Sequence, residues 1–466
     1  MSIARRLYTM LPPSLKDVAA SLYGCRLARL RYGKETPELV RAMREREAWE
    51  PEQWRRFQGE ALRRLVRHAS RCVPYYRDAW AKARIDVESV ENVRDIEKLP
   101  FTEKKDVRER NSEFLNERMK KSAFHPEHTS GTTGTPLDLW WTKATCRLWY
   151  AFFEARIRNW AGVRWGDRWA MLGGQLVVPV TRTRPPFWVW NAPFRQLYMS
   201  AYHLKDEFIP YYLDELERRQ VTYLYGYASC LYQLARHAIS ANRKLTFKAA
   251  FSNAEPLCTT HRQAIAEAFN CTVRDTYSGA EIVCLASECD SGNLHVSPDV
   301  GLVEIVNDLG ERCEAGEVGE IVSTGFVNVN MPLIRYKTGD RAALSDDKCP
   351  CGRSMPVLQS LEGRKDDVLY TTDGRPVGSA ALSLVFKTQL PIKLAQVEQK
   401  ALGRIIIRIV PDAGYSEQTE VGIAEKLRER LGPVDVTFEK ADDIPRGPGG
   451  KFRAVISRLP PASRPI

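Results

Sequence analysis

The chain has 466 residues and a formal net charge of +11, with 44% hydrophobic and 27% charged residues. This composition is ordinary for a folded globular protein and excludes a largely disordered chain, and the length allows two or three domains of about 150 residues each. No run of 18 apolar residues occurs, so we expect no membrane span.

The first 95 residues have the spacing of amphipathic helices, with Trp54, Leu62 and Leu65 on one apolar face. Residues 1–67 carry 15 Lys or Arg against 8 Asp or Glu. Such a basic excess attracts nucleic acid, an anionic membrane or a polyanionic small molecule such as ATP. Arginines alternate with glutamates over residues 41–47, as in a solvated helix with ion pairs, which disfavours a dedicated nucleic-acid face.

The segment Met1–Gly24 mixes Arg5, Arg6, Lys16 and Asp17 into short apolar stretches. It lacks the unbroken apolar core of a signal peptide, so we expect a cytoplasmic protein. An interfacial role of this amphipathic segment at a membrane surface stays open.

A polar stretch covers residues 98–121, and Thr102 is predicted to cap a helix within it. The loop Thr129–Pro136 then gathers glycines and hydroxyls before an aromatic helix predicted at residues 146–160. Glycines let the backbone approach a ligand, and amides and hydroxyls donate to phosphate oxygens, so the loop is a candidate phosphate site. A flexible surface loop is the alternative. The candidate residues are Ser130, Gly131, Thr132, Thr133 and Gly134.

The middle of the chain alternates between strand and helix patterns. Strands are predicted at residues 169–172, 175–180, 222–225, 247–252 and 272–277, and helices at residues 211–219, 229–240 and 259–269. This order predicts a wound α/β sheet, in which ligands bind at the carboxyl ends of the strands. Two predicted strands end in polar loops, Ser252–Pro256 and Tyr277–Glu281.

After residue 300 the pattern changes to short half-buried strands, which predicts a small β-rich lobe. These strands are expected at residues 303–306, 320–323 and 341–344. Beyond residue 363 the order becomes β-α-β-β-α-β, which predicts a small α+β domain. Its elements are expected at residues 369–377, 382–390, 393–399, 404–410, 416–431 and 434–440. We therefore expect a large N-terminal domain over residues 1–363 and a small, mobile C-terminal domain over residues 364–466.

Five motifs follow one another in a fixed order. They are the loop at residues 129–136, Tyr277–Glu281, Tyr336–Asp340, Gly363–Asp367 and Pro445–Arg453. Together they resemble the signature of adenylate-forming enzymes, which include acyl-CoA synthetases and peptide-synthetase adenylation domains. Leu137 follows the loop where most branches carry a lysine, which resembles the phenylacetate-CoA ligase branch. Arg31–Gly33 and Asn253–Leu257 resemble a subgroup known as capsular polysaccharide biosynthesis proteins.

The resemblance implies that a carboxylate attacks the α-phosphorus of ATP, which gives an acyl-adenylate and pyrophosphate. The loop would hold the β and γ phosphates, and Glu281 would bind Mg²⁺ beside them. Lys451 would bridge the entering carboxylate and the α-phosphate as a mobile point charge. The other implied ATP contacts are Ser252, Asn253, Ala254 and Glu255 at the adenine edge, Tyr277 along the adenine with Ser278 and Gly279, Asp340 at the ribose hydroxyls, and Arg364 at ribose or phosphate.

The resemblance also implies that the C-terminal domain rotates at Asp366 between adenylation and acyl transfer. Coenzyme A is the expected acyl acceptor, and an amine or amino sugar is the alternative. A non-enzymatic basic binding protein would explain the charge but not the ordered motifs. The sequence leaves the acid and the oligomeric state open. The aromatic residues Trp149, Phe152, Tyr225 and Tyr227 are candidates for either an acid pocket or the core.

Three cysteines and one histidine are predicted to form a structural zinc site. They are Cys289, His295, Cys349 and Cys351, with Cys284 as a substitute ligand. Three sulfurs and one imidazole complete a tetrahedral zinc site, although Cys-x-Cys is a less typical spacing than Cys-x₂-Cys. Reduced surface thiols are the alternative interpretation.

Overall fold

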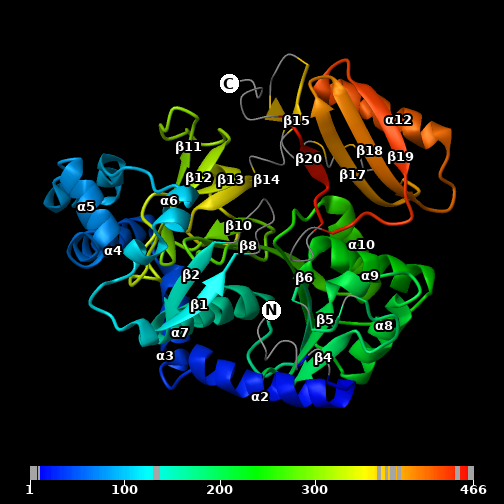
Figure 1. The fold of residues 1–466 in the computed structure, drawn as a ribbon, viewed down its shortest axis with the longest axis horizontal. Helices are drawn as coiled ribbons and strands as arrows, with labels where there is room; N and C mark the ends of the chain where they lie inside the picture. The colour runs from blue at the N-terminus through cyan, green and yellow to red at the C-terminus, as the bar shows by residue number, and fades with distance from the viewer. Residues whose placement is uncertain are drawn as a thin grey trace.

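The structure is a computed structural model that describes residues 8, 11–129, 137–175, 177–179, 181–364, 369–372, 376–377, 382, 385, 390–446 and 452–459. The helices predicted in the first 95 residues are confirmed. They are α2 (Pro13–Arg31), α3 (Thr36–Glu45), α4 (Pro51–Cys72) and α5 (Pro74–Lys82), with 3₁₀ turns η1 (Arg46–Ala48), η2 (Val87–Ser89) and η3 (Val93–Lys98). The apolar face of α4 lies in the core, with Leu62 fully buried. In Figure 1, α2 runs along the lower edge of the molecule.

Thr102 does not cap a helix, which corrects the prediction. The helix α6 (Lys104–Glu109) begins after Glu103, whose backbone N–H donates to Asp106 Oδ2 at 3.1 Å. Thr102 is buried and donates its hydroxyl to the Ile334 carbonyl at 2.7 Å, and its backbone pairs with Tyr336. The buried hydroxyl therefore satisfies a carbonyl just before β13 (Tyr336–Ser345) instead of a helix end. This pairing fixes the start of α6 against the motif that contains Tyr336.

The aromatic helix is confirmed in extent, but its second half is not α-helical. The helix α7 (Lys143–Phe152) continues as the π-helical turn η6 (Phe153–Arg158) and the 3₁₀ turn η7 (Asn159–Ala161). Before it, β1 (Phe124–His128) and β2 (Asp138–Thr142) form an antiparallel hairpin that the sequence did not predict. Neither strand has the clean apolar alternation that marks a strand in sequence.

One 12-stranded sheet forms the centre of the molecule, in the order β11-β12-β13-β14-β10-β9-β8-β7-β6-β3-β5-β4. Its parallel part consists of β3 (Trp169–Gly173), β5 (Gln196–Ser200), β6 (Tyr223–Tyr227), β7 (Ala249–Asn253) and β8 (Thr272–Ser278), and β4 (Trp188–Asn191) is the antiparallel edge strand. The strand predicted at residues 175–180 is wrong, because the described residues of that range form bends and irregular backbone.

Helices cover both faces of the parallel strands, as a wound sheet requires. The helices α8 (Ile209–Arg218), α9 (Ala228–Ser240) and α10 (Thr259–Phe269) are those predicted from the sequence, and α10 has the predicted bounds. On β6, Leu224 packs into the core beneath these helices, while Tyr223 and Tyr225 pack into the core shared with α7. Because successive side chains of a strand point to opposite faces of the sheet, β6 contributes to two separate hydrophobic cores.

The strands of the predicted β-rich lobe extend the same sheet rather than forming a separate one. They are β9 (Leu285–Glu288), β10 (Leu294–Val296), β11 (Gly301–Val306), β12 (Gly319–Gly325), β13 (Tyr336–Ser345) and β14 (Val357–Arg364). Antiparallel pairing of β8 with β9, and of β9 with β10, connects them to the wound part.

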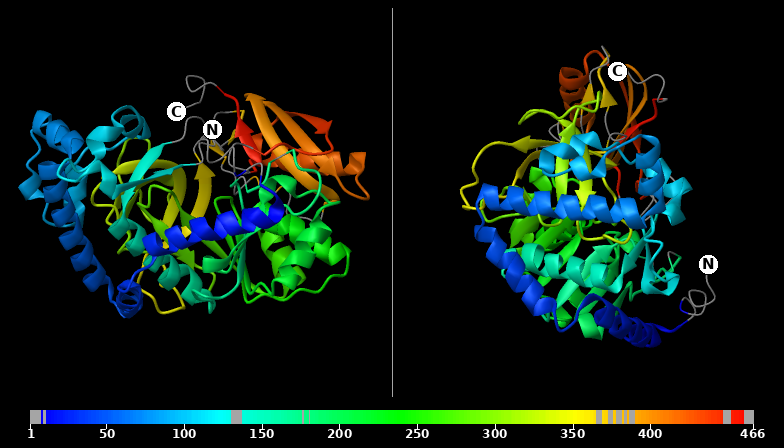
Figure 2. Two further views of the ribbon diagram at one scale, coloured as in Figure 1. Left: turned by 60° about the horizontal axis from the view of Figure 1, so that its bottom comes forward. Right: turned by 90° about the vertical axis from the view of Figure 1, so that its left-hand side faces the viewer.

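The C-terminal residues form a four-stranded sheet with its own core. Its order is β19-β18-β17-β20, from β17 (Ile392–Ala401), β18 (Arg404–Pro411), β19 (Asp435–Lys440) and β20 (Val455–Ser457), and α12 (Glu417–Leu431) packs on it. The predicted hairpin is present as β15 (Leu369–Tyr370) and β16 (Pro376–Val377), while the helix predicted at residues 382–390 falls largely outside the described residues. Figures 1 and 2 show this sheet beside α9 and α10, on the opposite side of the molecule from α2.

Candidate active site

Tyr277 and Asp340 meet at the carboxyl end of β8. The Tyr277 hydroxyl donates to Asp340 Oδ2 at 2.8 Å, and Asp340 pairs through its backbone with Arg364 on β14. Burial, and then the adjacent carboxylate, raise the pKa of Tyr277 well above its ordinary value, so the phenol remains a donor. The sheet therefore brings residues of three separate motifs together.

Glu281 lies beside this pair in a nearly closed environment. Its Oε1 accepts from the Tyr336 hydroxyl at 3.2 Å and lies 3.7 Å from Lys104 Nζ, and the carboxylate side chain is 13% exposed. A Cβ added at Gly279 would lie 2.5 Å from Glu281 Oε2, so this glycine leaves room for the carboxylate. A single carboxylate fits a site in which Mg²⁺ takes its other ligands from phosphate and water.

Lys104 was not among the residues selected from the sequence. No sequence pattern marks Lys104 as a site residue. It reaches the site because it lies two residues after Thr102, whose backbone pairs with Tyr336. Lys104 thus reaches Glu281 across 177 positions of chain, a contact that no local pattern encodes.

The predicted adenine loop leaves the carboxyl end of β7. Ser252 is fully buried, and its carbonyl accepts from the Thr276 hydroxyl at 2.8 Å, which joins the ends of β7 and β8. Ala254 has φ of 60°, in the left-handed region that non-glycine residues rarely adopt. Strain of this kind is concentrated at ligand sites, because the surrounding structure must hold it.

Glu255 connects the sheet to the C-terminal residues. Its Oε2 accepts from the Ser229 backbone N–H at 2.9 Å, at the first turn of α9, and its Oε1 accepts from the Phe452 N–H at 2.7 Å. Arg446 Nη1 lies 3.9 Å from Glu255 Oε1 and donates to Ser229 Oγ at 2.9 Å. The two described residues that flank the segment carrying Lys451 therefore both contact Glu255.

The candidate phosphate loop is closed at its base by Thr129 and Leu137. The Thr129 N–H donates to the Leu137 carbonyl at 3.1 Å, and the Leu137 N–H donates to Thr129 Oγ1 at 3.0 Å. The Leu137 side chain is fully buried, so it contributes to the core instead of facing a ligand.

Several predicted residues lie outside the described part of the chain, and their roles stay predictions. They are Ser130, Gly131, Thr132, Thr133, Gly134, Asp366 and Lys451, together with the side chain of Arg364. The four aromatic candidates for an acid pocket, Trp149, Phe152, Tyr225 and Tyr227, are all buried in the two main cores.

The predicted metal ligands converge. One ligand atom each from Cys289, His295, Cys349 and Cys351 lies within 4.8 Å of the others. The sulfurs of Cys289 and Cys349 are 3.6 Å apart, and Cys351 Sγ is 3.3 Å from His295 Nε2. A zinc tetrahedron with bonds of about 2.3 Å to sulfur and 2.0 Å to nitrogen has edges of roughly 3.5–3.8 Å, so the set fits the ion.

The surroundings of these ligands suit a metal as well. His295 Nδ1 lies 3.0 Å from the Met355 carbonyl, which leaves Nε2 to face the sulfurs. Burial opposes ionisation of Cys349, but donors including the Cys351 backbone N–H and the Asn293 amide outweigh it and lower the pKa of this thiol to about 6. A thiolate is the form that binds zinc. Cys284 is buried elsewhere, in the core beneath β9 and β10.

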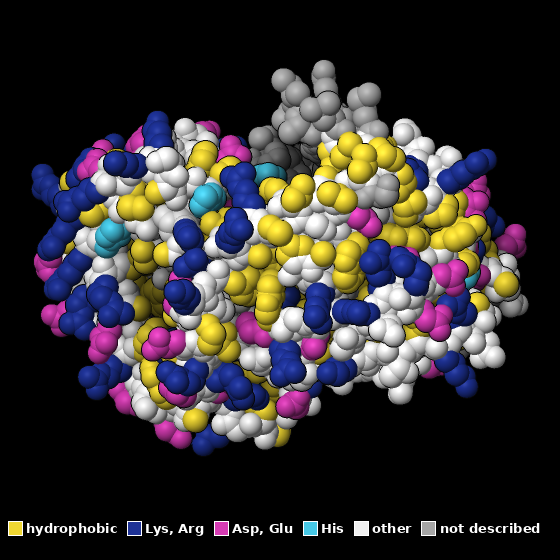
Figure 3. All heavy atoms as spheres, turned by 90° about the horizontal axis from the view of Figure 1, so that it is seen from below, with side chains coloured by type: hydrophobic (Ala, Val, Ile, Leu, Met, Phe, Trp, Pro, Cys, Tyr) yellow, Lys and Arg dark blue, Asp and Glu magenta, His cyan; other side chains and the backbone are white. Residues whose placement is uncertain are grey.

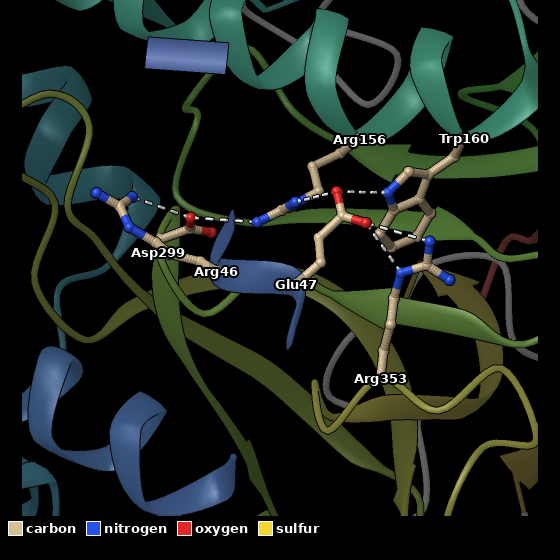
Figure 4. A network of polar contacts seen from close by, with 6 residues as sticks. All are labelled: Arg46, Glu47, Arg156, Trp160, Asp299 and Arg353. Atoms are coloured by element: carbon tan, nitrogen blue, oxygen red, sulfur yellow. Dashed lines mark hydrogen bonds and ion pairs between the residues drawn. The ribbon is translucent and has the colours of Figure 1, made fainter. Parts of the chain in front are cut away.

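A buried ion-pair network connects this cluster to the N-terminal helices (Figure 4). Glu47 accepts from Arg156 Nη1 at 2.6 Å, from Trp160 Nε1 at 3.0 Å and from Arg353 Nη2 at 3.2 Å. Arg156 is fully buried and also reaches Asp299, which pairs with Arg46. Since Arg353 lies two residues after Cys351, the network holds the segment that carries Cys349 and Cys351 against η1 and η6.

Comparisons with known proteins show which proteins this chain resembles. The family model described as CapK C-terminal domain matches residues 369–458. Protein CapK of Staphylococcus aureus is 26% identical over 97% of this chain and 99% of that protein. A phenylacetate-coenzyme A ligase of Thermus thermophilus is 26% identical over 87% of this chain and 96% of its own length.

A solved structure of 2-hydroxyisobutyryl-CoA ligase has the same fold, with a TM-score of 0.72 and 20% identity, over 88% of this chain and 91% of that one. The chain is an adenylate-forming ligase. Within that superfamily it is similar to the phenylacetate-CoA ligases and to CapK.

Proposed function

We propose that the enzyme activates a carboxylic acid with ATP to an acyl-adenylate and then transfers the acyl group to coenzyme A. The observation that carries this proposal is the hydrogen bond between Tyr277 and Asp340, with Glu281 held close to them by the Tyr336 hydroxyl. Since the reaction brings a carboxylate to a polyanion, the site must neutralise phosphate charge before it orients the reactants.

The proposed roles follow the chemistry of each side chain. Asp340, oriented by the Tyr277 hydroxyl, accepts hydrogen bonds from the ribose, and Arg364 contacts ribose or phosphate. The adenine lies among Tyr277, Ser278, Gly279 and the loop Ser252–Glu255. Ser130, Gly131, Thr132, Thr133 and Gly134 donate to the β and γ phosphates. Glu281 holds Mg²⁺, whose charge offsets that of the phosphates when it is bound.

Lys451 is proposed as the group that acts at the α-phosphate. Arg446 and Phe452, which flank its segment, both contact Glu255 near the end of β7. The chain also superposes better on the post-adenylation state of 2-hydroxyisobutyryl-CoA ligase, with a TM-score of 0.72, than on its thioesterification state, with 0.55. Both facts support an arrangement suited to the first half-reaction, with rotation at Asp366 between domains 1–363 and 364–466 for the second.

Zinc is proposed as a structural ion. The four ligands come from the turn after β9 (Cys289), from β10 (His295) and from the segment between β13 and β14 (Cys349 and Cys351). The ion would therefore join segments between which the described residues form no disulfide. Reduced thiols and a supply of ATP and coenzyme A agree with a cytoplasmic location.

Coenzyme A is the acceptor that the phenylacetate-coenzyme A ligase relatives favour. An amine or amino sugar stays the alternative, because Protein CapK, which aligns with 97% of this chain, has a name that specifies no acceptor. Incubating a purified acyl-adenylate with the enzyme and either coenzyme A or an amino sugar distinguishes them, since only one mixture should yield the thioester or the amide.

Lys451→Ala tests the proposal directly. We expect loss of acid-dependent ATP–pyrophosphate exchange, while a preformed acyl-adenylate is still consumed in the presence of acceptor. Lys440→Ala, which changes a lysine on β19, is the matched control. Exchange at the wild-type rate in Lys451→Ala would contradict the assigned role.

A further inference from the structure

The helix α2 has its polar side turned toward the protein. The Asp17 carboxylate accepts from the Trp190 N–H at 2.9 Å, and the Ser21 hydroxyl donates to the Trp190 carbonyl at 3.3 Å and accepts from the Ala192 N–H at 3.1 Å. These backbone groups belong to the edge strand β4 and the residue after it, which have no further strand beside them. The polar side chains of α2 therefore cover an open sheet edge.

The opposite side of α2 presents a stripe of apolar residues to solvent. Leu15, Val18 and Leu22 are spaced by three and four residues and are 49%, 53% and 68% exposed, and the adjacent Tyr23 is 54% exposed. These four are among only ten large apolar residues that are exposed in the described part of the chain. Single exposed apolar residues are ordinary, but a stripe along one helix marks an interaction surface. Figure 3 views the molecule from the side on which α2 lies and shows apolar side chains interspersed with Lys and Arg.

The N-terminal segment that carries this stripe is strongly basic. Residues 1–34 contain seven Lys or Arg and a single acid, Asp17. That acid points inward and lies 3.7 Å from Arg219. Arg26 and Arg29 are exposed on the same side of α2 as the apolar stripe. The outward face is therefore apolar and cationic without a compensating carboxylate of its own.

We propose that α2 docks this enzyme on an anionic membrane surface. Leu15, Val18 and Leu22 would enter the boundary between headgroups and acyl chains, while Arg26 and Arg29 contact lipid phosphates. A second copy of the chain fits less well, because a two-fold contact would bring two copies of this cationic face together without acids of their own between them. The described residues include no helix long and apolar enough to cross a membrane, so attachment would be peripheral.

Docking through α2 is compatible with the reaction. Figure 1 places α2 at the edge of the molecule remote from the four-stranded C-terminal sheet. A membrane on that side would leave the C-terminal residues room to move. Membrane docking through α2 would be the same whichever acid or acceptor the enzyme uses.

Vesicle cosedimentation of the full chain tests the proposal. We expect binding to vesicles of equal parts phosphatidylglycerol and phosphatidylcholine that is lost in high salt, and much weaker binding to phosphatidylcholine alone. Leu15→Ser/Leu22→Ser should weaken binding by about tenfold or more, since two side chains no longer leave water. Arg26→Gln/Arg29→Gln should reduce binding to the anionic vesicles selectively.

The matched control is Leu309→Ser/Val421→Ser, which removes two apolar side chains that are 83% and 56% exposed elsewhere. It should bind vesicles as the wild type does, and all variants should keep the wild-type melting temperature. The proposal is overturned if the wild type does not bind anionic vesicles, or if the α2 variant and the control bind equally. It is also overturned if light scattering shows a dimer that Leu15→Ser/Leu22→Ser dissociates, since a second copy would then cover α2.

Discussion

Substitution of Glu255 by glutamine should separate the two half-reactions. The carboxylate accepts the Phe452 N–H at 2.7 Å and lies 3.9 Å from Arg446, so it connects the C-terminal residues to the first turn of α9. A hydrogen bond to a charged group contributes about 1.5–3 kcal/mol. Because the Glu255 side chain is only 6% exposed, solvent screens this contact little. Glutamine keeps one acceptor oxygen but loses the charge and the second acceptor, so the adenylation arrangement should become less favourable by up to about 150-fold.

The assay compares acid-dependent ATP–pyrophosphate exchange with consumption of a preformed acyl-adenylate. Glu255→Gln should slow the exchange by up to that factor and leave consumption of the adenylate near the wild-type rate. Glu429→Gln, at a side chain on α12 that is 69% exposed, is the matched control and should change neither rate. Equal losses in both assays would show that Glu255 acts on the nucleotide, and no loss in either would show that the contact does not support adenylation.

Three further substitutions probe separate parts of the structure. Gly279→Ala should raise the Mg²⁺ concentration required for half-maximal exchange, because the new Cβ would displace Glu281 Oε2. The control is Gly422→Ala, whose added Cβ meets nothing within 4 Å. An unchanged Mg²⁺ requirement in Gly279→Ala would refute the reasoning. Cys349→Ser should lower the zinc content of purified protein and its melting temperature, whereas Cys25→Ser, at an exposed thiol, should change neither; a wild-type protein that carries no zinc would contradict the metal site. Burial, and then the charge of Glu288, raise the pKa of Asp275 to about 7, so the folded protein holds a proton that the unfolded chain releases above about pH 4. The free energy of unfolding should therefore fall as the pH rises from about 4 to 7, and Asp275→Asn should flatten this decline in urea unfolding. Asp290→Asn, at a carboxylate that is 74% exposed, is the control and should leave the decline unchanged. An equal dependence of unfolding free energy on pH in both variants would be inconsistent with the assignment.

The sequence predicted elements well where local pattern and tertiary environment agree. The helix α10 has the predicted bounds because its start, periodicity and end are all local. Hydrophobic pattern likewise identified β6 and β7, since strands buried on both faces are largely apolar. The edge strand β4 escaped prediction because the contacts of its free edge come from α2, where Asp17 lies 173 residues before Trp190. The Thr102 cap failed because a buried contact with Ile334 outcompeted the helix end.

The candidate site shows the same division. Ordered motifs selected Tyr277, Glu281 and Asp340 as candidate site residues, and residue type alone selected four candidate metal ligands, which the fold brings within 4.8 Å of one another. The contacts of Lys104 with Glu281 and of Arg353 with Glu47 were not predictable, because each joins residues far apart in the chain through geometry that only the folded sheet defines. The role of Glu255 at the C-terminal residues was missed for the same reason.

Direct detection of the acyl-adenylate tests the central claim. The purified full chain would be incubated with Mg-ATP and a panel of aryl, acyl and amino acids without an acceptor, and the products would be examined by mass spectrometry. We expect at least one acid to yield pyrophosphate together with its acyl-AMP, and Lys451→Ala to yield neither. Release of ADP and phosphate in place of AMP and pyrophosphate would contradict the adenylation chemistry.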